Sequence, residues 1–151
     1  MHPYPHVYAA TAGGRPEGAV ALTSSGLSEI ATAPPPEFGG PGGVWSPETL
    51  LCASLADCFV LSFRAIARAS GFEWNTLACR VEGVLERVEG VSRFTKYTTF
   101  ASLEVPSGSV AEKARKLLEK AEHLCLISNS VNGERSLVAD VTVVPAVTVA
   151  G

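Results

Sequence analysis

The sequence has 151 residues, of which 46% are hydrophobic and 18% are charged, and its formal net charge is -3. This balance is typical of a folded globular chain, and the length suits a single domain over residues 1–151. Because Lys and Arg form no cluster, we expect neither nucleic acid nor a membrane surface as a partner.

The N-terminal residues 1–6 lack the basic patch and the apolar run of a signal peptide. The longest apolar segment, residues 50–69, is interrupted by Asp57, Arg64 and Arg68, so we interpret it as a buried helix rather than a membrane span. We therefore expect a cytoplasmic protein, in which thiols stay reduced. Four cysteines in such a chain indicate reactive or buried thiols rather than a structural disulfide framework.

Short β-prone segments occupy the start of the chain, and turn-forming residues separate them. The segments are residues 7–11, 19–23 and 27–32, with turns at residues 13–18 and 24–26. This pattern predicts an antiparallel meander. Residues 34–43 follow as a loop, because their Pro and Gly content suits neither a strand nor a helix.

Ser46, Pro47 and Glu48 form a typical helix start: a capping Ser, a Pro at the first helical position and an acid in the first turn. We expect this helix to run to about Ser70, because Gly71 supplies a stop. It is apolar on most faces, which predicts a central position in the fold.

Two strands, a second helix and a last strand are predicted over residues 79–88, 95–105, 109–125 and 137–149. Glu89-Gly90 lies in the turn between the first two strands, and Gly83 marks a bulge. Ser109 and Glu112 match a capping box that opens the second helix. Its expected core face is Val110, Ala114, Leu117, Leu118 and Ala121. The element order predicts an α+β fold, with two helices packed on an antiparallel sheet.

Cys58 lies in the middle of the predicted central helix, where a free Cys is usually a small buried hydrophobic residue. A reactive role requires a lowered pKa, because the thiolate is the nucleophile. The helix dipole fades within the first turn and Arg64 points elsewhere, so a reactive Cys58 would need a cation from another segment. The residues alone leave both roles open.

Arg15 and Glu48 are the candidates for activating such a thiolate. Arg15 is either an ordinary solvated residue of a Gly-rich turn or a permanently charged partner with a planar set of donors. Glu48 either complements the helix dipole or orients and neutralises that Arg. Glu48 lies on the order of 15 Å along the helix from Cys58. A bent helix, the long Arg or a second subunit must bridge this gap, and we favour the subunit.

Cys125 falls at the C-terminal end of the second helix, where the dipole opposes thiolate formation. It is the poorer attacking thiol, but it can condense with a sulfenic acid to form a disulfide. The loop over residues 126–130 can supply the mobility for this closure. Cys52 and Cys79 have no comparable context, and we expect them to be packing residues.

No other pattern indicates a cofactor or a catalytic group. The three His residues have no ligand spacing, and neither a CxxC nor an HExxH motif occurs, so we expect no zinc site. Ser24-Ser25-Gly26 lacks the pattern of a nucleophile elbow, and the Gly-rich residues 39–43 lack the Lys-Ser/Thr end of a phosphate-binding loop.

Several short blocks follow one another along nearly the whole chain. They are Gly13-Gly14-Arg15 with Gly18; Ser25-Gly26-Leu27; Pro36-Glu37-Phe38-Gly39-Gly40 with Gly42-Gly43; Ser46-Pro47-Glu48-Thr49-Leu50-Leu51; Ala56-Asp57-Cys58-Phe59; and Cys125 with Ser128-Asn129. Each block is weak by itself, but the ordered set is specific. In this set the sequence resembles the OsmC/Ohr family of osmotically inducible and organic hydroperoxide resistance proteins.

The resemblance implies an OsmC-like fold and an intertwined homodimer with both active sites at the interface. In that family the Cys matching Cys58 reduces organic hydroperoxides, and the Cys matching Cys125 resolves it. The residues matching Arg15 and Glu48 activate the thiolate. Electrons come from an external dithiol, in one branch a lipoylated protein, and no metal or flavin is bound. The resemblance therefore predicts a thiol peroxidase for oxidative stress defence, with a sulfenate at Cys58 and then a Cys58–Cys125 disulfide.

Two positions depart from the family pattern. Asp57 replaces the small residue usual before the reactive Cys, and its charge raises a neighbouring thiol pKa unless it faces elsewhere on the helix. Leu126 stands where many relatives have Pro. The early Gly-Gly-Arg looks like the organic hydroperoxide branch, whereas residues 64–71 look like the broader OsmC-like group. The subfamily and its reductant therefore stay open.

The residues leave two alternative functions open. One is a non-catalytic dimer of the same fold that senses oxidants or binds a small apolar ligand, with packed and silent cysteines. The other is a thiol-dependent hydrolase, for which the sequence places no His or Asp as a base.

Overall fold

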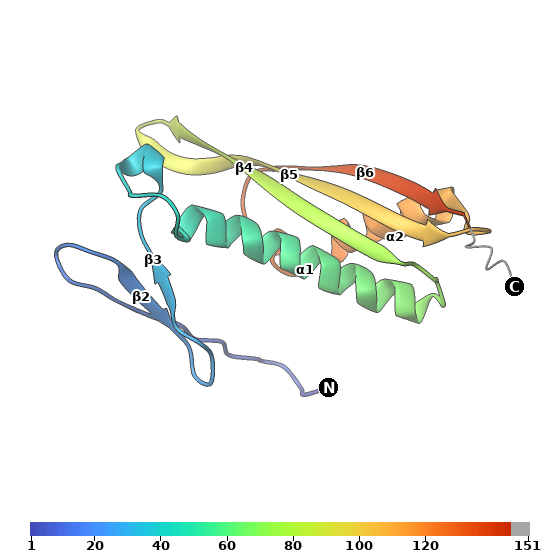
Figure 1. Cartoon of the computed structure of the whole chain (residues 1–151), viewed down its shortest axis with the longest axis horizontal. Coiled ribbons are helices and arrows are strands. Elements are labelled where there is room, and N and C mark those ends of the chain that lie inside the picture. The colour runs from blue at the N-terminus through green and yellow to red at the C-terminus, as the bar shows by residue number, and fades with distance from the viewer. Residues whose placement is uncertain (146–151) are drawn as a thin grey trace, which may run out of the picture. The chain divides into compact units, whose positions relative to one another are not determined.

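The computed structural model describes residues 1–145, and Figure 1 shows its helices and strands in chain order. Two compact units divide the chain, one of residues 1–50 and the other beginning at Leu51. The first unit holds three short strands, and the second holds the longer strands and both main helices apart from the start of the first helix. The predicted α+β class is confirmed.

The first unit contains a small antiparallel sheet. Its strands, in sheet order, are β1 (Thr11–Gly13), β2 (Val20–Thr23) and β3 (Ile30–Thr32). The predicted meander is confirmed, but its first strand lies at residues 11–13, because β2 ends at Thr23, whose partner is Thr11. The predicted loop after β3 includes one turn of 3-10 helix, η1 (Pro36–Phe38).

Few residues of the first unit are buried in the single chain: they are Thr32, Ala33 and Ser46. Large apolar side chains stay exposed, including Leu27, Ile30, Phe38, Val44 and Trp45. The first unit therefore buries few apolar side chains of its own.

Helix α1 (Pro47–Ala69) begins as the sequence predicts. The Oγ of Ser46 accepts a hydrogen bond from the backbone N–H of Thr49 at 3.2 Å, and Oγ1 of Thr49 accepts one from the N–H of Ser46 at 2.9 Å. This reciprocal cap satisfies donors that the helix start leaves free. The helix ends at Ala69, next to the predicted Ser70, and Gly71 follows with a φ of 59°.

The second unit is built on a three-stranded sheet in the order β4 (Thr76–Val88), β5 (Val91–Pro106) and β6 (Glu134–Val144). The first two strands form an antiparallel hairpin around Glu89 and Gly90, as predicted. β6 pairs with β5 in parallel, which corrects the wholly antiparallel sheet predicted from the sequence. The physical reason is helix α2 (Ala111–Leu124), which carries the chain back along the sheet before β6 begins. The predicted last strand included residues 146–149, which lie outside the described residues.

Gly83 lies beside an irregularity of the hairpin, as predicted, since the register of β4 and β5 shifts between Val84 and Leu85. The presence of a glycine at position 83 has a second explanation. A Cβ added there would lie 2.7 Å from Cε1 of Phe94 and 3.2 Å from Sγ of Cys52. The close approach of the Phe94 ring therefore requires a glycine.

Both helices pack on one sheet and share one hydrophobic core (Figure 1). Its buried members are Phe59, Phe63 and Ala67 from α1, Ala101, Leu103 and Val105 from β5, and Ala114, Leu117, Leu118 and Ala121 from α2. The predicted core face of α2 is confirmed except for Val110, which precedes the helix and is exposed.

The predicted capping box at Ser109 does not form. The N–H of Ser109 donates to the carbonyl of Pro106 at 3.2 Å, so Ser109 closes a turn after β5. The helix begins two residues later, with Val110 as N-cap and without a side-chain cap.

In the single chain, α1 buries one stripe of side chains rather than most of its faces. Leu55, Phe59, Phe63 and Ala67 are buried, while Leu61 on the opposite side is 49% exposed. With a mean hydropathy of 1.8 over its most apolar window, α1 is also long and apolar enough to cross a membrane by length and composition alone. The core helix of a soluble protein passes the same test, so this is weak evidence of a membrane span.

Gly133, just before β6, allows a prediction on stability. Its φ of 121° is one that side chains rarely adopt, and an added Cβ would lie 2.9 Å from the carbonyl oxygen of Thr95. We predict that Gly133→Ala lowers the free energy of unfolding by about 2 kcal/mol or more, because backbone strain and a clash combine. Urea denaturation followed by circular dichroism measures the loss. In the control Gly13→Ala, the added Cβ meets no described atom within 4 Å, and an equal loss in both variants would contradict this explanation.

Candidate active site

Cys58 lies in the middle of α1 and is half-buried. Ser62 lies one helical turn further on, and its Oγ is 3.9 Å from Sγ of Cys58. Residues four apart share a face of a helix, so this hydroxyl is a polar neighbour that α1 itself provides. The other hydrogen-bonding groups at the sulfur come from the segment that follows α2.

Cys125 ends helix α2, and its side chain is fully buried. Its backbone is extended, with a ψ of 115°, which turns the chain away from the helix axis. Cys125 lies close enough to Cys58 that each cysteine shifts the pKa of the other thiol, and both are free thiols. The structure thus brings together the two residues predicted as attacking and resolving thiols.

The segment after Cys125 is a closed turn rather than an open loop, and it includes a short 3-10 helix, η2 (Ser128–Ser130). The N–H of Asn129 donates to the carbonyl of Cys125 at 3.0 Å, and the N–H of Ser130 donates to that of Ile127 at 2.9 Å. We call residues 125–130 the Cys125 turn. Its internal hydrogen bonds restrain the backbone conformation of the turn.

Hydrogen bonds decide the protonation of Cys58. Burial acts to raise the pKa of its thiol, because an anion loses hydration there. Four donors act in the opposite direction and together outweigh burial: the backbone N–H of Ile127, the thiol of Cys125, the hydroxyl of Ser62 and the backbone N–H of Leu126. The pKa of Cys58 is therefore below the ordinary value. Neutral donors stabilise this thiolate, whereas the sequence interpretation required a cation.

The pKa of the Cys125 thiol is shifted in the opposite direction, above the ordinary value. Burial raises the pKa of its thiol, hydrogen bonds with Ser128 offset part of this effect, and the neighbouring Cys58 raises the pKa further. As the pH rises, Cys58 loses its proton first while Cys125 keeps its own. Such a pair suits Cys58 as the nucleophile and Cys125 as the thiol that later condenses with it.

The other two cysteines are protonated at neutral pH. Burial raises the pKa of Cys79 to about 12, with further contributions from Glu122 and Cys125. Burial also raises the pKa of Cys52, despite a backbone hydrogen bond from Gly83. Both findings agree with the predicted packing role. Within residues 1–145, no three His, Cys, Asp or Glu side chains are grouped in a way that suits a metal ion.

Arg15 and Glu48 both lie in the first unit. Arg15 is exposed in the turn between β1 and β2, and no ion pair found within residues 1–145 includes it. Glu48 lies in the first turn of α1, and its Oε2 atom is buried with no hydrogen-bond partner among the described residues. A buried carboxylate oxygen without a partner is energetically unfavourable. In the single chain, the two residues predicted to act together do not form an ion pair.

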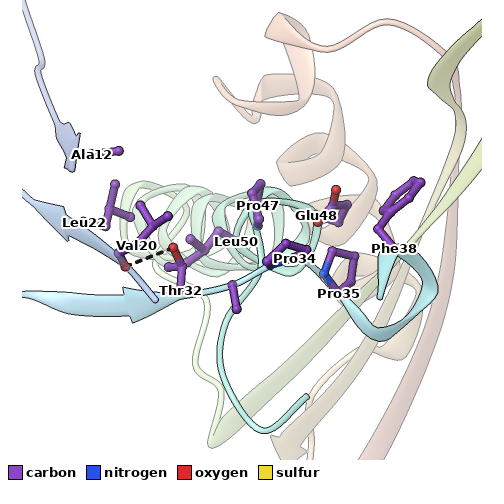
Figure 2. A pocket seen from close by; sticks show the side chains of 11 residues that line it. Ala12, Val20, Leu22, Thr32, Pro34, Pro35, Phe38, Pro47, Glu48 and Leu50 are labelled. Carbon is purple, nitrogen blue, oxygen red and sulfur yellow. Dashed lines mark hydrogen bonds between the residues drawn. The ribbon is translucent and has the colours of Figure 1, made fainter. Parts of the chain in front are cut away.

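Glu48 lines an apolar cavity of about 450 Å³ within the first unit. Figure 2 shows the side chains that surround the cavity, among them Val20, Phe38 and Leu50. The hydroxyl of Thr32 also faces this region and donates to the carbonyl of Val20 at 3.4 Å. Because the wall is otherwise largely apolar, the Glu48 carboxylate is the group most suited to bind a cationic or N–H donor there.

The two departures from the family pattern have simple structural outcomes. Asp57 is exposed and is not among the groups that shift the pKa of Cys58. The side chain of Leu126 is 69% exposed, while its backbone N–H is a donor to Cys58. Pro has no N–H, so Leu126 supplies a hydrogen bond that Pro at this position could not.

Sequence reasoning missed the donors around the Cys58 sulfur. Ser62 had a recognisable signal, because it lies four residues after Cys58 on the same helix. The N–H groups of Leu126 and Ile127 had none, since nearly every residue carries an N–H and only the fold decides where it points.

Leu126 provides a direct test of the backbone donors. We predict that Leu126→Pro raises the pKa of Cys58, because it removes an N–H donor while the sulfur stays buried. The ultraviolet absorbance of the thiolate, followed against pH in a chain with Cys52 and Cys79 replaced by Ser, measures the shift. Leu126→Ala is the matched control, because it shortens the side chain and keeps the N–H. Equal titration curves for the Pro and Ala variants would contradict a role for this donor.

Comparison with known proteins agrees with this fold. The family model described as OsmC-like protein matches residues 40–138. The uncharacterized protein YmaD of Bacillus subtilis is 28% identical over 127 residues, which cover 82% of this chain and 85% of that protein. The structure of an OsmC-like protein of unknown function from Vibrio cholerae has a TM-score of 0.80 at 19% identity and covers 89% of this chain and 99% of its own. The structure of an organic hydroperoxide resistance protein OsmC from Legionella pneumophila has a TM-score of 0.73 at 27% identity. It covers 93% of this chain and 99% of its own. With more than half of its length matched by the family model, this chain belongs to the OsmC-like family.

Proposed function

We propose that the protein is a thiol peroxidase that reduces organic hydroperoxides. The Cys58 thiolate attacks the distal peroxide oxygen, the O–O bond breaks, and the leaving oxygen takes a proton to become an alcohol. Cys58 is left as a sulfenic acid. The Cys125 sulfur then attacks the sulfenic sulfur, a disulfide forms, and water leaves. An external dithiol restores both thiols through two exchange steps.

The observation that carries this proposal is the asymmetry of the Cys58–Cys125 pair. The pKa of Cys58 is lowered, so this sulfur suits nucleophilic attack, and the pKa of the neighbouring Cys125 thiol is raised. A non-catalytic dimer with silent cysteines requires no such difference. In Cys79, which has no comparable set of donors, burial raises the pKa to about 12. The contrast between Cys58 and Cys79 favours a redox cycle over a packing role.

We assign Arg15 and Glu48 to the same site in the assembled dimer. The unpartnered Oε2 of Glu48 supports a guanidinium as its partner, because a bidentate Arg satisfies a carboxylate efficiently. Arg15 is exposed in the single chain, and a second subunit provides the surface on which it can pack. Placed near the peroxide, Arg15 would stabilise charge on the leaving oxygen.

An apolar peroxide fits the proposal better than hydrogen peroxide. The cavity that Glu48 lines is largely apolar, and apolar walls favour an organic substituent. The Legionella pneumophila relative is an organic hydroperoxide resistance protein, which supports the same substrate class. We propose an external dithiol, such as a lipoylated protein, as the reductant, and the cytoplasm as the compartment. The cycle needs no bound cofactor or metal, since both redox groups are side chains of this chain.

We propose a homodimer as the working assembly. In the single chain, Leu27 is 71% exposed, Phe38 is 59% exposed and Trp45 is 49% exposed. So many large apolar groups on a sheet without its own core favour a permanent partner. A second copy of the chain is the partner that the resemblance to the OsmC/Ohr family implies.

Mass spectrometry after one equivalent of cumene hydroperoxide tests the peroxidase cycle. We predict a Cys58–Cys125 disulfide in the wild type, because the two thiols lie close enough to shift each other's pKa. In Cys125→Ser, excess peroxide should convert Cys58 to sulfinic and sulfonic acids, since no thiol resolves the sulfenate. Cys58→Ser should lose peroxide consumption.

The control for this experiment is Cys52→Ser, which removes a thiol from the same helix and should leave consumption at the wild-type rate. If Cys58→Ser consumes the peroxide as fast as the wild type, the proposed mechanism is wrong. If Cys58 is oxidised but the protein does not turn over with any dithiol, the oxidant-sensing alternative gains support.

Sedimentation equilibrium tests the homodimer. We predict a dimer for the wild type and weaker association for Phe38→Glu, because the variant places a charge among the apolar groups of the first unit. Val91→Glu is the control, since Val91 is 61% exposed at the hairpin between β4 and β5. A monomeric wild type, or equal weakening by both variants, would contradict the proposed interface.

A further inference from the structure

A set of polar side chains joins helix α2, the Cys125 turn and strand β6; Glu122 and Arg135 are half-buried, and Asn129 is exposed. Arg135 on β6 is its centre. Nε of Arg135 lies 3.6 Å from Oε1 of Glu122 in the last turns of α2. The guanidinium also donates to Oδ1 of Asn129 in the turn at 3.1 Å. One side chain therefore connects the segments before and after Cys125.

Asn129 binds the backbone at Cys125 and two residues before it. Its N–H donates to the carbonyl of Cys125 at 3.0 Å, and its side-chain amide donates to the carbonyl of His123 at 3.2 Å. Because Arg is a donor only, its contact with Oδ1 fixes which way the Asn129 amide faces. The position of Cys125 therefore depends on Asn129 directly and on Arg135 through Asn129.

The Arg135–Glu122 pair is more enclosed than the other ion pairs within residues 1–145. Its side chains are 26% and 13% exposed, compared with 65% and 51% for Arg80 and Glu82. Glu122 also accepts a hydrogen bond from Thr99 on β5 at 3.3 Å. An enclosed carboxylate with two partners on two strands restrains geometry more than a solvated pair does.

We propose that Arg135 is a positioning residue for the disulfide-forming step, in which it holds the Cys125 turn so that Cys125 faces Cys58. This inference rests on the proposed function. In that step the Cys125 sulfur bonds to the sulfenic sulfur, the S–O bond breaks, and the oxygen leaves as water with the thiol proton. The sulfenic acid is itself the oxidant, so the step needs no further reagent.

The first step, attack on the peroxide, depends less on Arg135. The Cys58 donors at residues 126 and 127 are held by Ser130, whose N–H donates to the carbonyl of Ile127 and whose Oγ donates to that of Leu126, each at 2.9 Å. These bonds do not involve Arg135. Replacing Arg135 should therefore slow disulfide formation more than attack on the peroxide. A general loss of structure would slow both steps.

Rapid-quench mass spectrometry of a single turnover with cumene hydroperoxide follows both steps in the full-length chain. In Arg135→Gln, the Cys58 sulfenic acid should form within about twofold of the wild-type rate, because Cys125 is only one of four groups that lower the Cys58 pKa. The disulfide should form about tenfold more slowly, because closure depends on alignment of the sulfurs. Arg135→Lys should give an intermediate rate, since Lys keeps the charge towards Glu122 but lacks the planar set of donors.

Two further variants make the test specific. Asn129→Ala leaves the Arg135–Glu122 pair in place and should slow closure in the same selective way. Lys116→Gln is the matched control, because it removes a positive charge from an exposed pair with Glu112 on the same helix, at 2.9 Å. Both steps should keep their wild-type rates in this control. Thermal melting of each variant shows that it is folded under the assay conditions.

Diamide, a thiol oxidant that forms the same disulfide without a peroxide, separates this inference from the proposed function. If the wild type ignores hydroperoxides but diamide-driven closure is slower in Arg135→Gln, the peroxidase proposal fails and the positioning role stands. The positioning role is overturned if closure with diamide and with peroxide occurs at the wild-type rate in Arg135→Gln. It is also overturned if both steps slow equally.

Discussion

Hydrogen bonds to one half-buried sulfur set the pKa of Cys58 apart from that of the other cysteines. Burial alone would keep Cys58 protonated, as it does Cys79. Donors from the Cys125 turn and from Ser62 reverse that balance at Cys58. One of these donors is the thiol of Cys125, so the contact that stabilises the thiolate also places a second thiol beside it. In the proposed cycle, residues 126 and 127 of the turn act mainly on the pKa of Cys58, and Cys125 acts mainly in disulfide formation.

The core of the second unit explains why the two sulfurs meet. Phe59 of α1 and Ala121 of α2 belong to one buried cluster that packs on the sheet. Cys58 immediately precedes Phe59, and Cys125 lies one helical turn after Ala121. The packing that holds the helices together thus also sets the position of the sulfurs. The parallel strand β6 contributes through Arg135, which reaches the turn that follows α2.

The sequence predicted features that depend on neighbouring residues, such as a helix cap. It did not predict features that depend on tertiary contacts, such as the direction of a strand. The helix start at Ser46 was correct, because capping involves only neighbouring residues. The similar signal at Ser109 failed, because a turn after β5 uses its N–H. The direction of β6 has no local signal. For the site, the dipole argument ranked Cys58 and Cys125 correctly in acidity, but the backbone donors were invisible because only the folded chain directs them.

The pH dependence of alkylation by iodoacetamide, measured for each cysteine by mass spectrometry, tests the central claim most directly. Only the thiolate reacts, so the profile reports the protonation state of each sulfur in the folded protein. We predict that Cys58 reacts first, with a midpoint below the ordinary thiol pKa of about 8.5, while Cys52, Cys79 and Cys125 react slowly. A Cys58 midpoint at or above that value, or faster labelling of Cys125, would contradict the account.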